Sequence, residues 1–156
     1  MHKDPAFLFY PKDWLSGTSD MMLDEKGAYI DLLAQQHQHR VLPDDPARLA
    51  RMVGLSQDEF DRIWVKVSTK FIHVSGSMVN LKLKRVIDER AVNAKKKRIA
   101  GAFASWLKGK NLPKDAYKDI KKEFSVEWFL EFTEESIILE VSTWCSKWLS
   151  TWTSTR

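Results

Sequence analysis

The stretch TKFIHVSGSMVNLKLKR, residues 69–85, decides the fold class that this sequence predicts. Two short apolar runs, Phe71–Val74 and Met78–Leu83, flank the tripeptide SGS at positions 75–77. Short apolar runs on either side of a small, glycine-containing turn are typical of a β-hairpin. Lysine and arginine follow the second run, while most of the chain has helical patterning. The sequence therefore predicts one basic hairpin in a protein that is otherwise mainly α.

Apolar residues at helical spacing predict three helices before the hairpin. The first covers about residues 24–38, with Asp24 expected at its N-cap. The second is short, because Asp45 can cap it, Pro46 suits its first turn and Gly54 can end it. The third, residues 57–70, opens with the capping-box sequence SQDE at positions 56–59.

The third helix has two chemically different faces. Four apolar residues fall on one side at 100° per residue, namely Phe60, Ile63, Trp64 and Val67. The opposite side gathers polar and basic residues, namely Arg62, Lys66, Thr69 and Lys70. The helix is thus expected to have a buried side and a solvent-facing basic side.

Three helices followed by a two-stranded hairpin predict a winged helix-turn-helix, in which the second helix of the pair enters the DNA major groove. The hairpin tip would be the wing, and small residues there would let it approach a phosphate backbone. The acidic start of the third helix, residues 58–61, argues that its C-terminal half would lead. The DNA-contacting residues expected from this arrangement are Arg62, Lys66, Thr69, Lys70, Ser75, Ser77, Lys82, Lys84 and Arg85.

Charge is concentrated in one part of the chain. The formal net charge is +4, but residues 82–122 carry 14 basic and 4 acidic side chains. The residues before and after this block are net acidic. A basic block between acidic segments indicates a localised anionic partner, of which nucleic acid is the commonest. The alternative is a helix whose charges are simply solvated.

A long helix with basic residues at its centre is expected over residues 84–108. Four consecutive cations, Lys95, Lys96, Lys97 and Arg98, spread around such a helix, so two or three phosphate contacts are realistic. Here too, a solvated helix face is the alternative.

The two ends of the chain are rich in aromatic residues. The first 20 residues are expected to be an extended segment packed on the core. A further short helix is expected over residues 114–132. Residues 134–152 fit either a helix or a strand. On a helix, Trp144, Trp148 and Trp152 would form one ridge, which would pack either inside the chain or in an oligomer or partner interface.

Several classes of function find no support in the sequence. The motifs GxxxxGKS/T, GxSxG and HExxH are absent, so we do not expect an enzyme. His37 and His39 would point about 200° apart on a helix, so neither a metal site nor a cofactor is expected. No apolar run approaches the roughly 20 residues of a membrane span. The single cysteine, Cys145, fits a reducing compartment, and we expect a cytoplasmic protein.

The sequence resembles a family of phage and prophage proteins that share a winged-helix domain and resemble phage replication initiators. The resemblance covers about residues 4–98 and rests on several pieces that occur in order at the expected spacing. These pieces are Phe9-Tyr10, Asp13-Trp14, GTSDMMLDEKGAYIDLLAQQ (17–36), VLPDDPARLARMVG (41–54), EFDRIWVKVSTKF (59–71) and Val79-Asn80-Leu81. The resemblance implies DNA binding during phage replication in a bacterial host cell, at an origin or in loading a helicase. Relatives with a replication role often have a longer C-terminal region than the short tryptophan-rich segment of this chain. This difference argues against helicase loading more than against DNA binding.

Together these features predict three parts. Residues 1–83 would form a winged-helix domain with an N-terminal arm, residues 84–110 a basic helix, and residues 111–156 a tryptophan-rich oligomerisation or partner segment. The predicted function is DNA binding in replication initiation, with DNA, a second copy of the chain and a replication protein such as a helicase as partners. The alternatives are a winged-helix adaptor that binds protein and a phage transcriptional regulator.

Overall fold

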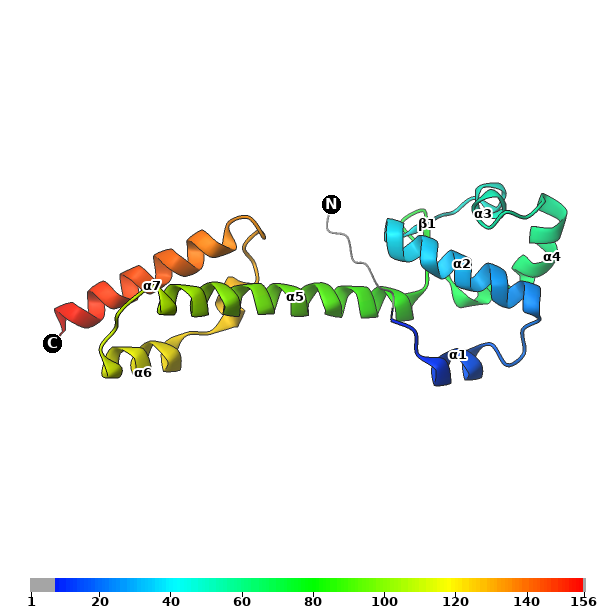
Figure 1. The fold of residues 1–156 in the computed structure, drawn as a ribbon. Helices are drawn as coiled ribbons and strands as arrows, with labels where there is room; N and C mark the ends of the chain where they lie inside the picture. The colour runs from blue at the N-terminus through cyan, green and yellow to red at the C-terminus, as the bar shows by residue number, and fades with distance from the viewer. Residues whose placement is uncertain (1–7, 156) are drawn as a thin grey trace. The chain divides into compact units, whose positions relative to one another are not determined.

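The computed structural model describes residues 8–155, and the chain divides into two compact units, Met1–Asp88 and Glu89–Arg156. The described residues are mainly helical (Figure 1). The first unit also contains a three-stranded antiparallel sheet. The elements in chain order are α1 (Pro11–Gly17), α2 (Leu23–His39), β1 (Leu42–Pro43), α3 (Pro46–Met52), α4 (Gln57–Val67), η1 (Ser68–Lys70), β2 (Ile72–Val74), β3 (Ser77–Val79), α5 (Leu81–Lys108), α6 (Lys114–Glu123), η2 (Val126–Phe129) and α7 (Ile137–Ser154). The boundary between the units falls within α5.

Two of the three expected helix caps are confirmed. Asp45 Oδ1 accepts hydrogen bonds from two backbone N–H groups at the start of α3. Ser56 and Glu59 form the expected capping box at the start of α4. The prediction for α2 is wrong, because its N-cap is Met22, whose N–H donates to Glu25 Oε2 at 2.7 Å. Asp24 therefore lies inside the first turn of α2.

The hairpin is confirmed and has a two-residue turn. Val74 pairs with Ser77, which leaves Ser75 and Gly76 between β2 and β3. Both turn residues have positive φ, 49° and 74°. Two positive φ values define the type I′ turn, whose twist matches that of the flanking strands and which favours glycine.

The sequence did not predict β1, and the expected extended arm is partly helical. Strand β1 pairs with β3 through Leu42↔Met78, giving the strand order β1-β3-β2. A strand of two residues shows no alternating pattern from which it could be recognised. Helix α1 starts at Pro11, whose fixed φ suits a first helical turn, so an extended arm over all of the first 20 residues is wrong.

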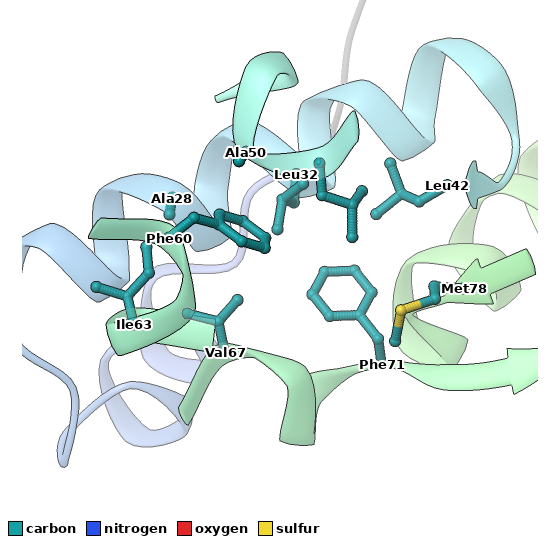
Figure 2. Close-up of a cluster of buried hydrophobic side chains, with 10 residues drawn as sticks. Ala28, Leu32, Leu42, Ala50, Phe60, Ile63, Val67, Phe71 and Met78 are labelled. Carbon is teal, nitrogen blue, oxygen red and sulfur yellow. The ribbon is translucent and has the colours of Figure 1, made fainter. Parts of the chain in front are cut away.

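The core of the first unit joins α2, α3, α4 and the sheet. Figure 2 shows Leu32, Leu42, Phe60 and Phe71 converging between the helices and the hairpin. The apolar side predicted for α4 is confirmed, since Phe60, Ile63 and Val67 are buried. This burial leaves the opposite side of α4 facing solvent.

A buried asparagine, Asn80, links three elements of the first unit. Asn80 N–H donates to Gln36 Oε1 of α2 at 2.7 Å, and Gln36 Nε2 donates back to Asn80 O at 3.1 Å. The Asn80 amide donates to Tyr29 Oη and to Lys70 O, and its Oδ1 accepts from the N–H of Leu83. The last bond caps α5, which begins three residues earlier than the sequence predicted.

Replacing Asn80 with alanine should destabilise the first unit more than removing an exposed cap does. Loss of a cap costs about 1 kcal/mol, and buried groups left without partners add about 1–3 kcal/mol. We expect Asn80→Ala to lower the free energy of unfolding by about 2–4 kcal/mol in urea denaturation followed by circular dichroism. Asp45→Ala, which removes the exposed cap of α3, is the control. Equal losses in the two variants would contradict the central role of Asn80.

The second unit packs α5, α6, η2 and α7 around its own core. Ile99, Phe103, Ile120, Val141 and Cys145 are among its buried residues. The C-terminal segment, which the sequence left open between helix and strand, is the helix α7. The helix expected over residues 114–132 ends at Glu123, because Phe124 leaves helical geometry and stacks on Phe103 with ring centroids 3.8 Å apart.

Cys145 lies in the core of the second unit. Its side chain is fully buried, and burial raises the pKa of its thiol to about 11 because an apolar environment disfavours the thiolate.

The thiol of Cys145 should report the unfolding of the second unit. At pH 8 a pKa of about 11 leaves only ~0.1% thiolate, and the folded chain also blocks reagent access. We expect iodoacetamide to leave the native protein unmodified and to alkylate it fully in urea, as measured by intact mass. Fast modification of the native chain would contradict this burial.

Candidate nucleic-acid interface

The solvent-facing side of α4 carries the basic residues that the sequence predicted. The Arg62 side chain is 71% exposed and that of Lys66 is 37% exposed. Thr69 lies in η1, where its hydroxyl donates to Lys66 O at 2.7 Å. Lys70 ends η1 and is half-buried. These residues therefore share the end of α4 and the turn that follows it.

Two aspartates near the start of α2 pair with these cations. Arg62 Nη2 lies 2.7 Å from Asp24 Oδ2, and Lys66 Nζ contacts Asp20 Oδ2. The Lys66 hydrogen bond lowers the pKa of Asp20, and the Asp20 hydrogen bond raises the pKa of Lys66. Both groups are therefore charged at neutral pH, and the positive charge of this side of α4 is largely balanced within the protein. These pairings could not be predicted from the sequence, because the partners lie 38 and 46 residues apart.

The hairpin turn is exposed, and His73 of β2 contacts an aspartate. Ser75 and Gly76 are exposed, and Ser77 is half-buried. His73 Nδ1 lies 2.9 Å from Asp44 Oδ2.

The cations after the hairpin lie on the first turns of α5. Lys82 Nζ is 2.7 Å from Asp13 Oδ2, and Lys84 pairs with Asp88 one turn along the helix. Arg85 is exposed and forms no ion pair with any residue that the structure describes.

The basic run at residues 95–98 lies in the second unit and holds the chain around η2. Lys95 Nζ donates to Leu130 O, Lys96 is 3.3 Å from Glu127, and Arg98 is 3.4 Å from Glu134. The pKa of Glu127 is lowered first by the Ser125 hydroxyl and also by Lys96. Lys97 is exposed and has no ion pair within residues 8–155. Three of the four residues therefore have structural partners.

The tryptophan ridge of α7 contacts α6 and η2. Trp144 packs against Phe124 and Trp128 with ring centroids 5.6 Å apart in each case. The indole N–H of Trp148 donates to Glu123 at 2.6 Å, and that of Trp152 donates to Asp119 at 3.1 Å. An oligomer interface at this ridge stays a prediction.

Helix α6 carries basic residues that were not among the DNA contacts predicted from the sequence. Four exposed lysines lie on this helix, namely Lys114, Lys118, Lys121 and Lys122. Successive lysines are four, three and one residues apart, a helical spacing that the sequence contains.

A cavity of about 190 Å³ lies in the first unit beside α1 and α2. Trp14 and Tyr29 stack in its wall with ring centroids 5.5 Å apart. Burial raises the pKa of Tyr29, against a smaller lowering by Asn80. Lys70 and Lys82, both predicted DNA contacts, also line the cavity, so the structure brings these two residues together.

Two further searches cover only the described part of the chain. None of its helices is both long and apolar enough to cross a membrane. No three His, Cys, Asp or Glu side chains within residues 8–155 are grouped as metal ligands would be.

Residues 8–88 thus form a small helical domain with a three-stranded antiparallel sheet and an exposed hairpin turn. The family described as "Protein of unknown function (DUF1376)" matches residues 7–88, and the chain belongs to this family. The match ends at Asp88, the last residue of the first unit. Comparisons with curated proteins and with solved structures gave no match.

Removing the two aspartates that pair with α4 tests whether this side of the helix meets DNA. In Asp20→Asn/Asp24→Asn, Arg62 and Lys66 lose their carboxylate partners, and repulsion of phosphate falls. We expect duplex affinity to rise on the order of tenfold at low salt, measured by fluorescence anisotropy. Glu131→Gln/Glu135→Gln makes the same charge change in the second unit. If the two variants gain equally, α4 has no special role.

Proposed function

We propose that this protein binds DNA and that its first unit is a winged helix-turn-helix. The observation that carries the proposal is α4, which buries its apolar side in the core and turns Arg62 and Lys66 to solvent. The element order α2-β1-α3-α4-β2-β3 supports it, with α3 and α4 as the helix pair and β2-β3 as the wing. In such proteins the second helix of the pair reads the major groove.

The ion pairs of α4 are compatible with binding. Exposed ion pairs contribute little to stability, and salt screens them further. Phosphate oxygens can therefore replace Asp24 on Arg62 and Asp20 on Lys66. In the free protein these pairs hold the two cations in place, so DNA would meet positioned side chains.

The charges of α4 indicate which half of the helix would enter the DNA major groove. Asp58, Glu59 and Asp61 lie in the first half of α4 and repel phosphate. Arg62, Lys66 and Thr69 lie in the second half and in η1. The C-terminal half therefore makes the contacts, and the turn at Ser75 and Gly76 approaches the backbone.

The role in phage replication initiation rests on the sequence resemblance alone. The resemblance implies a bacterial host cell and a helicase or another replication protein as partner. A second copy of the chain, which would let two winged helices bind a repeated site, is proposed from the tryptophan ridge of α7. A transcriptional regulator would make the same DNA contacts and would differ in the site bound. A protein-binding adaptor would bind DNA weakly and independently of Arg62.

Titration of the full chain against random duplex and single-stranded DNA tests this function. We expect dissociation constants of about 10⁻⁴–10⁻⁶ M for random duplex, weakening steeply with salt. Arg62→Ala/Lys66→Ala should reduce duplex affinity severalfold and flatten the salt dependence, because two phosphate contacts are lost.

The control is Lys147→Ala, which removes an exposed cation of α7. It should bind as the native chain does. Absence of DNA binding at low salt would refute the proposed function.

A further inference from the structure

Helix α6 has a lysine face that points away from the core of the second unit. Ala116 and Ile120 are its buried residues. At 100° per residue, Lys114, Lys118, Lys121 and Lys122 fall within an arc of about 100°. The buried residues fall on the opposite side of the helix. All four lysines are exposed.

These four lysines differ from most of the other candidate contacts in their ion pairing. Arg62, Lys66, Lys82, Lys96 and Arg98 each have an acidic partner. The four lysines of α6 form no ion pair with any residue that the structure describes. No ion pair within the protein therefore has to break before these lysines bind an anion.

Two of the three carboxylates of α6 are held away from the lysine face by α7. Glu123 accepts from the Trp148 indole and Asp119 from the Trp152 indole. On the helix Asp119 lies about 110° and Glu123 about 150° from the centre of the lysine arc. Asp115 lies at its edge. The tryptophan ridge thereby fixes which side of α6 faces solvent.

An aromatic ring adjoins this face. Lys121 Nζ lies 4.9 Å from the centroid of the Tyr117 ring, a cation–π contact, and Tyr117 is 44% exposed. Basic residues beside exposed rings suit nucleic acid, because cations meet the phosphates while rings can stack on unpaired bases.

We propose that the lysine face of α6, defined by Lys114, Lys118, Lys121 and Lys122, binds the phosphodiester backbone of DNA and supplies much of its salt-dependent affinity. This inference rests on the proposed function and adds a contact surface in the second unit. From Lys114 to Lys122 the helix advances about 12 Å. At 3.4 Å per nucleotide of one strand, this length spans about three to four phosphates.

The test compares charge-matched variants of the full chain by fluorescence anisotropy over a range of salt concentrations. Lys118→Gln/Lys122→Gln should lower DNA affinity at least tenfold at low salt and reduce the salt slope by about 2, since each phosphate contact contributes about 0.9. Lys108→Gln/Lys147→Gln removes two exposed lysines of the same unit that form no ion pair with any described residue, and it should change the slope by less than half as much. Circular dichroism and protection of Cys145 from alkylation check that the fold is kept.

The outcomes separate this inference from the proposed function. If Arg62→Ala/Lys66→Ala weakens binding but Lys118→Gln/Lys122→Gln matches its control, the proposed function stands and the lysine face of α6 is refuted. If the native chain binds neither duplex nor single-stranded DNA, both are refuted. Binding to phosphatidylserine vesicles without DNA binding, lost in the α6 variant, would overturn the inference in favour of a membrane surface.

Discussion

The hydrogen bonds of Asn80 are the constraint on which the first unit depends. This one buried side chain and its backbone join Gln36 of α2, Tyr29 of α2, Lys70 of η1 and the first turn of α5. Unmet buried amide groups are costly, so each partner is held in a single position. The carbonyl of Lys70 fixes where η1 ends, and η1 carries Thr69. The exposed side of α4 is therefore positioned partly by a residue outside it.

Electrostatics in this chain is decided by partners that are distant in sequence. Residues 82–122 have the largest positive charge, yet several of their cations pair with carboxylates of the folded chain. Lys96 contacts Glu127 of η2, Arg98 contacts Glu134, and Lys82 contacts Asp13 of α1. The four exposed lysines of α6, by contrast, form no ion pair with any described residue. A count of charges along the chain therefore locates a basic block but does not show which of its members can meet an anion.

The features that the sequence predicted correctly depend on contacts between residues close together in the chain. The capping box at Ser56, the Asp45 cap and the hairpin each depend on residues within about four positions of one another. What it did not predict depends on tertiary contacts. Strand β1 exists because Leu42 pairs with Met78, and α6 stops where Phe124 can stack on Phe103. At the candidate site, the exposed side of α4 followed from helical periodicity, but its pairing with Asp20 and Asp24 required the folded chain.

The tryptophans of α7 show how an aromatic segment can shape a charged surface without belonging to it. An indole is a donor only, so Trp148 and Trp152 can satisfy the carboxylates of Glu123 and Asp119 without adding positive charge. An arginine in the same position would pair with these acids but would leave a further cation beside α6. A leucine would leave the acids free to turn toward the lysines. The two indoles add no cation beside α6, and they keep Glu123 and Asp119 directed away from its lysines. The exposed face of α6 is therefore dominated by the positive charge of its lysines.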